Sequence, residues 1–256
     1  MVTYSFSLTY THGIGTVWLR ELNGHDELLT EGSGTPGALN LLRNIIVQHQ
    51  FGEKELKAEK IVTADRDYLL ASVYQYTFGP RIQSVLQCAA CHSRFDLDFM
   101  LPDWITHTRQ GATDPVRDDE GFYRMADDTK FRLPDGSDEM AIWGLPVEEA
   151  EQLLLQRCVP GPILKERSAA IQQAMAQQAP VLMANMSATC PECGHTQSAH
   201  FDLQAFLLAR MRNERKRVAA EVHCLAVAYQ WSHREILDLP RSLRKTYVSL
   251  NGFESF

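Results

Sequence analysis

The sequence predicts an α+β fold, in which a mixed body is followed by a helical C-terminal region. Several short segments alternate between apolar and polar residues, which is typical of strands, while others repeat apolar residues every three or four positions, as helices do. The third observation is a Cys-x-x-Cys motif that occurs twice, each time between strand-like segments. With 256 residues, of which 45% are hydrophobic, the chain can bury a sizeable core. We expect the body over residues 1–200 and the helical region, packed on it, over residues 201–256.

The first sixty residues predict two strands and a helix. Alternating apolar residues within 2–21 indicate strands joined near Gly13–Gly15. After a glycine-rich loop, Thr35 and Pro36 predict the N-cap and first turn of a helix that continues to about Val47. Residues 51–62 are charged and are interpreted as a connector.

A second helix and the first cysteine motif follow. Thr63 begins a helix with Asp65 and Asp67 near its first turn, and Gly79 lies just past its end. Its inward face is predicted to consist of Leu69, Leu70, Val73, Tyr74 and Tyr76. A strand over Ile82–Leu86 then leads to Cys88, and a strand over Phe95–Phe99 leaves the motif.

The middle of the chain is acidic and contains a strong turn signal. Residues 107–128 carry six carboxylates and are interpreted as a solvated loop; a calcium site is the alternative, but the ligand spacing of an EF-hand is absent. The turn Pro134–Gly136 predicts a hairpin between strands at Phe131–Leu133 and Met140–Trp143.

The remaining elements are mostly helical. We expect helices over Pro146–Cys158 and 163–179, and a strand over Val181–Thr189 that enters the second cysteine motif. Apolar steps then predict a long helix over Leu203–Tyr229, with one gap at Glu214–Arg215. A capping box between Ser232 and Glu235 begins a short helix, and a last helix ends at about Leu250.

The two Cys-x-x-Cys motifs indicate one structural Zn²⁺ site formed by Cys88, Cys91, Cys190 and Cys193. A two-residue spacer allows both thiolates to reach one tetrahedral ion, and two strand–knuckle–strand halves that meet form a zinc-ribbon-like joint. Such a closed site leaves no open position for catalysis. The lone Cys158 and Cys224 are expected to be buried apolar residues.

Other readings of the cysteines remain open. Each motif could hold a separate metal with help from His92, His195 or His200, could have lost its metal, or could be a redox pair. The segment Cys88–His92 also spells the Cys-x-x-Cys-His motif for covalent haem attachment. That attachment requires export, for which the N-terminus carries no signal, and haem would leave the second motif unexplained.

Composition and motifs favour a soluble cytoplasmic protein that is not an enzyme. The sequence has no stretch of about 18 apolar residues, no phosphate-binding loop, no His-Glu-x-x-His and no nucleophile elbow. Residues 1–200 hold 16 Lys and Arg against 26 Asp and Glu, which disfavours a general nucleic-acid surface. The basic run Arg210–Arg217 is the one hint of such binding, and we interpret it as the solvated face of an amphipathic helix.

Several ordered motifs resemble the T4-type phage baseplate protein family, which includes hub-assembly proteins of contractile tails and relatives in contractile injection systems. In the first half these are Thr63–Leu70, Tyr76–Gly79 with the strand and knuckle that follow, and the hairpin-like Phe131–Gly136. In the second half they are Thr189–Gly194, the helix containing Glu221-Val222-His223, and Tyr229–Leu237. In the first knuckle, Ala-Ala replaces the family's Pro-x, and His92 stands where Gly is common.

The resemblance spans about residues 15–250 and implies a non-catalytic tail or baseplate factor. Such a protein would bind baseplate or hub proteins of a contractile tail-like particle, either within the hub or during its assembly. It would act in the cytoplasm of a bacterium or an infected host cell. The alternative is a zinc-ribbon regulator that binds nucleic acid, and a thiol-dependent redox enzyme is a further rival.

Overall fold

A computed structural model describes residues 3–29, 32–49, 56–110 and 117–252 of the chain. It contains both helices and strands, as the α+β prediction requires. The contacts within it divide the chain into two compact units. Unit 1 comprises Met1–Leu8, Gly13–Ala58 and Leu207–Phe256, and unit 2 comprises Thr9–His12 and Glu59–Phe206. This grouping differs from the expected division near residue 200, since the C-terminal helices share a unit with the first strands.

Unit 1 begins with a three-stranded antiparallel sheet and two helices. The sheet is formed by β1 (Thr3–Ser7), β2 (Thr16–Arg20) and β3 (Ile46–His49), in that order. The helices are α1 (Gly24–Leu29) and α2 (Gly34–Ile45). The first two strands are as predicted, but Thr35 is not the N-cap of α2. Ser33 occupies that position, so the helix begins two residues earlier than the sequence indicated.

The rest of unit 1 is helical, with α8 (Leu203–Tyr229) followed by α9 (His233–Asp238) and α10 (Arg241–Leu250). The chain passes from unit 2 into unit 1 within the first turn of α8. One apolar face of α8 is fully buried and includes Leu207, Met211 and Leu225. The predicted capping box between Ser232 and Glu235 begins α9. A side chain at Gly37 of α2 would lie 3.1 Å from Leu208 of α8, so the glycine permits the close approach of these two helices.

A cluster of buried charges joins α1, α8 and α10, and no sequence signal marks it. Arg244 is fully buried and pairs with Glu27 and with Glu221, the latter at 2.7 Å. Arg241 pairs with Glu27 and with Glu214. Arg217 pairs with both Glu214 and Glu221. We call these six residues the ion cluster: Glu27, Glu214, Arg217, Glu221, Arg241 and Arg244. Glu214 interrupts the apolar pattern of α8 because it belongs to this cluster rather than to the solvent.

Unit 2 is organised around α3 (Thr63–Phe78), which has Gly79 at its C-cap as predicted. The first-turn carboxylates are buried instead of solvated. Asp65 accepts hydrogen bonds from the backbone N–H groups of Thr9, Tyr10 and Thr11, and thereby holds the N-terminal segment of this unit. Tyr76, expected to face inward, is 59% exposed, so the buried stripe of α3 is narrower than the sequence indicated.

The predicted hairpin at Pro134–Gly136 is wrong. Asp135 is instead the N-cap of α5 (Gly136–Ile142) and forms a capping box with Asp138. The strand before it, β7 (Lys130–Phe131), pairs with β6 (Tyr123–Arg124). Asp138 is fully buried and accepts from Arg132 and Arg157, which locks the turn into a helix start.

Helices α6 (Val147–Cys158) and α7 (Ser168–Gln178) complete this part of unit 2, with 3-10 turns η1 (Ala58–Lys60) and η2 (Lys165–Arg167). The predicted helix over 163–179 is thus split into η2 and α7. Cys158 is buried in the apolar cluster formed by these elements, as predicted, and Cys224 is buried in unit 1. Parts of the expected connector, residues 51–55, and of the acidic loop, including Asp114, lie outside the described residues.

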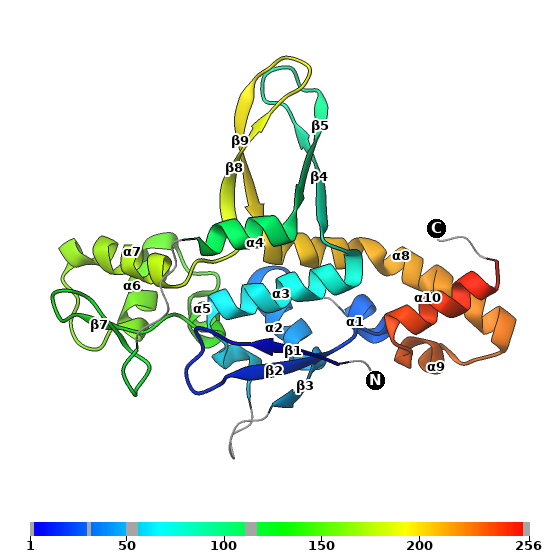
Figure 1. The fold of residues 1–256 in the computed structure, drawn as a ribbon, viewed down its shortest axis with the longest axis horizontal. Helices are drawn as coiled ribbons and strands as arrows, with labels where there is room; N and C mark the ends of the chain where they lie inside the picture. The colour runs from blue at the N-terminus through cyan, green and yellow to red at the C-terminus, as the bar shows by residue number, and fades with distance from the viewer. Residues whose placement is uncertain (1–2, 30–31, 50–55, 111–116, 253–256) are drawn as a thin grey trace. The chain divides into compact units, whose positions relative to one another are not determined.

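Two β-hairpins of unit 2 stand side by side, and their loops meet at one end (Figure 1). The first joins β4 (Arg81–Gln87) to β5 (Arg94–Met100), and the second joins β8 (Met183–Thr189) to β9 (Thr196–Asp202). Helix α4 (Leu101–Arg109), which the sequence analysis placed partly in a loop, follows directly after β5. Within the described ranges, no helix combines the length and apolar character needed to cross a membrane.

Candidate metal centre

The two hairpins are built alike from strand to loop. Each has two seven-residue strands that pair in antiparallel register, from Arg81↔Met100 to Gln87↔Arg94 in the first and from Met183↔Asp202 to Thr189↔Thr196 in the second. The cysteine motif occupies the loop in both cases. The strand–knuckle–strand element predicted from the sequence therefore occurs twice with the same register.

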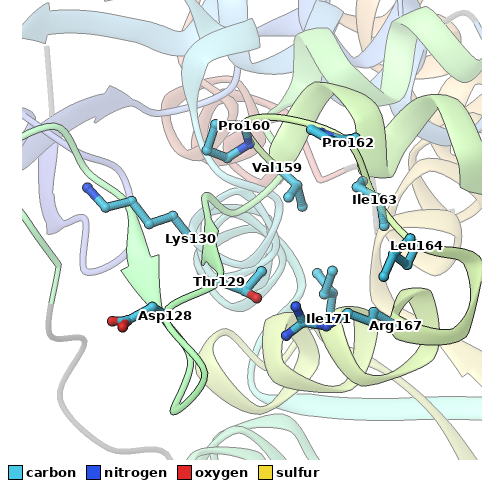
Figure 2. Close-up of a pocket in the computed structure, with 10 residues that line it drawn as sticks. All are labelled: Asp128, Thr129, Lys130, Val159, Pro160, Pro162, Ile163, Leu164, Arg167 and Ile171. Atoms are coloured by element: carbon cyan, nitrogen blue, oxygen red, sulfur yellow. The ribbon is translucent and has the colours of Figure 1, made fainter.

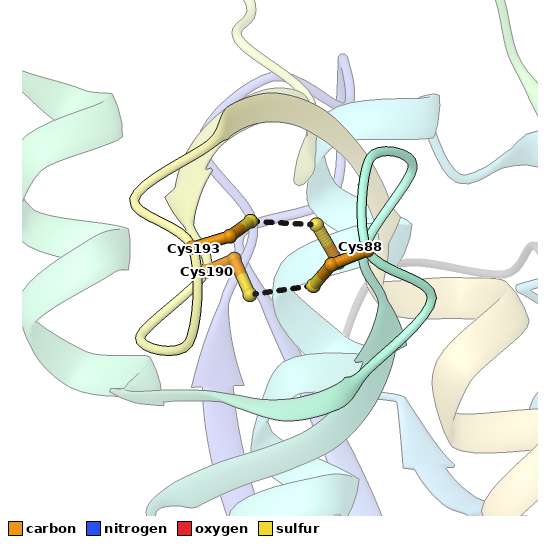
Figure 3. Close-up of side chains that lie close together, drawn as sticks. Cys88, Cys190 and Cys193 are labelled. Atoms are coloured by element: carbon orange, nitrogen blue, oxygen red, sulfur yellow. Dashed lines mark hydrogen bonds between the residues drawn. The ribbon is translucent and has the colours of Figure 1, made fainter.

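Each knuckle is closed by the same two backbone hydrogen bonds. In the first, the N–H of Cys88 donates to Ser93 O and the N–H of His92 donates to Cys88 O. In the second, the N–H of Cys190 donates to His195 O and the N–H of Gly194 donates to Cys190 O. In the loops folded in this way, the sulfurs of Cys190 and Cys193 point toward the first hairpin, and that of Cys88 points toward the second (Figure 3).

Four sulfurs from the two loops converge on one point. The Sγ atoms of Cys88, Cys91, Cys190 and Cys193 all lie within 4.8 Å of one another. The Cys88–Cys193 pair is 3.6 Å apart and the Cys91–Cys190 pair is 3.7 Å apart. A disulfide would require about 2.05 Å, so these are free thiols.

The spacing of the sulfurs fits a tetrahedral metal ion. Thiolates bound at about 2.3 Å in a tetrahedron lie about 3.8 Å from one another, which is close to the two short separations found here. Cys88 and Cys190 are buried, whereas Cys91 and Cys193 are exposed, so each knuckle contributes one inner and one outer ligand. The four cysteines can therefore hold a single metal ion.

The electrostatics of the thiols also favour a cation. Hydrogen bonds from Ser93 lower the pKa of Cys91 to about 6, which favours the thiolate form that binds metals. The N–H of His195 lowers the pKa of Cys193, but its contacts with the neighbouring thiols and burial outweigh this effect and raise that pKa to about 12. A bound cation favours thiolates over thiols, so it would counteract the contacts that raise the pKa of Cys193.

Gln197 joins the two hairpins beside the sulfurs, and the sequence analysis did not identify it. Its Oε1 accepts from the N–H of Ala89 in the first loop at 2.8 Å, and its Nε2 donates to Gln87 O at 3.0 Å. A small apolar cluster of Phe95, Ala188 and Ala199 lies beneath the buried cysteines. No sequence signal marks Gln197, because its partners are backbone groups more than a hundred residues away in the chain.

The histidines considered as alternative ligands are not part of the cysteine group. No histidine joins the four cysteines in the one group of potential metal ligands found among the described residues. His200 instead contacts the side chain of Asn185. In the acidic loop, Asp118 accepts from two backbone N–H groups and pairs with Lys130, so its carboxylate closes a turn. The calcium alternative thus has no ligand cluster in the part of the loop that the structure describes.

A hollow of about 510 Å³ lies between the β6–β7 turn and α7 (Figure 2). Its apolar wall includes Ile163, Leu164 and Ile171. The charged residues that line it are already paired within the chain: Asp128 with Arg124, Lys130 with Asp118, and Arg167 with Asp127. The hollow therefore offers apolar surface but no unpaired charge to orient a substrate.

Four of the five cations in the basic run on α8 have partners within the protein. Arg212 donates to Gly32 O, Arg217 pairs with Glu214 and Glu221, and Arg210 and Arg215 also have partners. Charges that are held in this way are less available to phosphate groups than the sequence alone indicated.

None of the family models, curated proteins or solved structures compared with this chain matches it. The resemblance to baseplate proteins therefore stays a prediction from the sequence motifs.

Proposed function

We propose that this chain is a non-catalytic structural or assembly factor, stabilised by one structural Zn²⁺, of a phage-like contractile tail or injection-system baseplate. The observation that carries the structural role is the convergence of four sulfurs from two distant loops. The link to a baseplate rests on the sequence resemblance alone.

The identity of the metal follows from the donor set. Four thiolates in a tetrahedron are typical of structural zinc sites, while harder ions such as Mg²⁺ and Ca²⁺ prefer oxygen ligands. Iron in a four-cysteine site is the main chemical competitor, and it would colour the protein. A site with four protein ligands has no open position for water or substrate, so its contribution is to folding.

Elemental analysis of freshly purified protein tests the metal assignment. We expect about one zinc per chain, and we expect the four thiols to resist alkylation until a chelator is added. Cys158 and Cys224 are buried single thiols, so a Cys158→Ser/Cys224→Ser double variant should bind the same amount of zinc. Loss of zinc from that double variant, or iron in place of zinc in the wild type, would contradict the proposal.

The baseplate role is tested by co-expression with the sheath, tube and hub proteins of a contractile particle. If the chain is encoded beside such genes and co-purifies with one of their products, the proposal gains direct support. Neighbouring genes with no such products, together with no co-purification of tail proteins, would remove it.

The alternative regulator makes a different prediction. A zinc-ribbon protein that binds nucleic acid should shift DNA or RNA at low salt and lose that binding as the salt concentration rises. We expect no shift, because Arg212 and Arg217 of the basic run already have partners in unit 1, and Arg210 and Arg215 also have partners.

A further inference from the structure

An exposed apolar surface lies between α5 and α6, far along the chain from either knuckle. Met140, Trp143, Leu145 and Val147 are 40%, 52%, 39% and 69% exposed, so four of eight consecutive residues present large apolar side chains to solvent. Single exposed apolar residues are ordinary, whereas a contiguous group marks an interaction site. Tryptophan and methionine are also enriched at protein interfaces.

The backbone holds this surface in place. The N–H of Trp143 donates to Met140 O, and the N–H of Leu145 donates to Ile142 O. Beneath it, the buried Asp138 fixes the start of α5 through its pairs with Arg132 and Arg157. An ordered turn therefore presents the apolar side chains, so binding of a partner would cost little conformational entropy at this surface.

A groove continues from this surface along α6. It has a volume of about 610 Å³, and its α6 wall presents Glu148, Glu151, Gln152 and Leu155, which share one face of the helix. The opposite wall is formed by Ser168, Ala169 and Gln172 of α7. Pro162 and Ile163 contribute apolar surface, and Lys165 also lines the groove. Its size lies within the range of ligand-binding clefts.

Three carboxylates follow the apolar residues at the start of α6. Glu148, Glu149 and Glu151 are exposed, and none of them has an ion-pair partner among the described residues. Unit 2 as a whole holds 12 Lys and Arg against 21 Asp and Glu. A partner must therefore supply apolar side chains for the exposed surface and cations for its acidic border.

We propose that Met140–Val147 and the adjoining α6–α7 groove form the docking surface for an amphipathic, lysine- or arginine-bearing segment of a partner protein. The proposal deepens the assembly role and rests on it, because it names the surface and the chemistry of the partner. A second copy of this chain is a poorer occupant, since its own exposed acidic residues would repel this border and the basic run on α8 is already engaged.

The test uses a fluorescent amphipathic helical peptide of leucine and lysine, with a leucine–glutamate peptide of the same spacing as counter-probe. Fluorescence anisotropy should show binding of the first peptide to the full-length protein and no binding of the second. Two double variants should each weaken binding of the leucine–lysine peptide by at least roughly tenfold. One is Trp143→Ser/Leu145→Ser, and the other is Glu148→Lys/Glu151→Lys. All of these positions are exposed or lie at the surface, so folding should be preserved.

Matched controls distinguish specific binding at this surface from nonspecific electrostatic or hydrophobic binding elsewhere on the protein. Val227 of α8 is 63% exposed and Glu120 is exposed in a turn, so Val227→Ser and Glu120→Lys repeat the chemistry elsewhere and should leave binding unchanged. No binding by the wild type, or equal losses in the controls, would overturn the docking surface. A wild-type dimer that Trp143→Ser converts to a monomer would assign the surface to a second copy instead.

The zinc content of every variant separates this proposal from the proposed function. If the surface variants retain zinc but bind the peptide as tightly as the wild type does, the docking surface alone is overturned. Absence of zinc, or absence of tail proteins in the co-expression experiment, would instead count against the assembly role.

Discussion

At the scale of single residues, the two knuckles differ at the position after the second cysteine. Both loops need a left-handed backbone there, with φ of 61° at His92 and 72° at Gly194. Glycine adopts this conformation freely, whereas a residue with a side chain pays roughly 1 kcal/mol for it. The first knuckle therefore contains local strain that the second avoids.

Exchanging the two residue types should show this difference. We expect His92→Gly to stabilise the zinc-loaded protein by roughly 0.5 kcal/mol and Gly194→Ala to destabilise it by roughly 1 kcal/mol. Urea unfolding at a fixed free-zinc concentration measures both. A lower unfolding midpoint for His92→Gly would mean that the imidazole makes a contact that outweighs the backbone strain.

A second residue-scale feature is the buried carboxyl of Asp67 on α3. It is 7% exposed and accepts a hydrogen bond from the N–H of Leu182, just before β8. Burial raises its pKa from 3.8 to about 7, although the charge of Arg66 acts in the opposite direction. Between these two values the folded state binds a proton that the unfolded state has lost, so this group's contribution to stability falls as the pH rises from about 4 to about 7.

Asp67→Asn should remove this pH dependence while it keeps the acceptor for Leu182. We expect the variant to match the wild type near pH 4 and to exceed its stability above about pH 7 by an amount on the order of a few kcal/mol. The measurement is the difference in unfolding free energy at several pH values. The exposed Asp103→Asn is the control, and an identical gain there, or a gain for Asp67→Asn that does not change with pH, would contradict the assignment.

At the scale of elements, the sequence predicted what local patterns determine. The strands that flank each knuckle, the helix that ends at Gly79 and the capping box at Ser232 all follow from residues close together in the chain. The four cysteines that come together were likewise predicted, because the Cys-x-x-Cys spacing marks them as candidate ligands of one ion even across the long intervening segment.

Other elements could not be predicted, because distant partners decide them. Pro134–Gly136 has the composition of a hairpin turn, yet the buried carboxylate of Asp138 and its two arginines make it the start of a helix. Glu214 has the pattern of a surface residue, but Arg241 of α10 draws it inside. In each case a buried ion pair overrode the local signal.

The link between the hairpins gives a prediction at this scale. Gln197→Ala removes two hydrogen bonds that join the hairpins, while the four sulfurs remain. We expect the zinc affinity to fall roughly fivefold, which corresponds to about 1 kcal/mol. Competition with a colorimetric chelator measures it, and Ser198→Ala on the same strand is the control. Equal affinity for Gln197→Ala and the wild type would show that the sulfurs alone align the loops.

At the scale of the whole molecule, the two stabilising devices belong to different units. The four sulfurs lie in unit 2, and the ion cluster lies in unit 1. Unit 1 is also weakly basic, with 13 Lys and Arg against 11 Asp and Glu, whereas unit 2 is strongly acidic. The proposed docking surface and the four-cysteine group therefore share a unit, and the paired arginines of the ion cluster lie in the other.

This separation predicts two independent losses of structure, which hydrogen exchange can resolve. Chelation of zinc should increase exchange in β4, β5, β8 and β9 and leave α9 and α10 protected, because the metal fixes only the hairpins. Arg244→Met should instead increase exchange in α9 and α10 and leave the hairpins protected. It removes one of the two cations that pair with each of the buried carboxylates of Glu27 and Glu221, at a cost of roughly 3 kcal/mol. The control Arg234→Met breaks only an exposed pair with Asp238 and should change little. If chelation also exposed α10, or if Arg244→Met loosened the hairpins, the units would have to unfold as one.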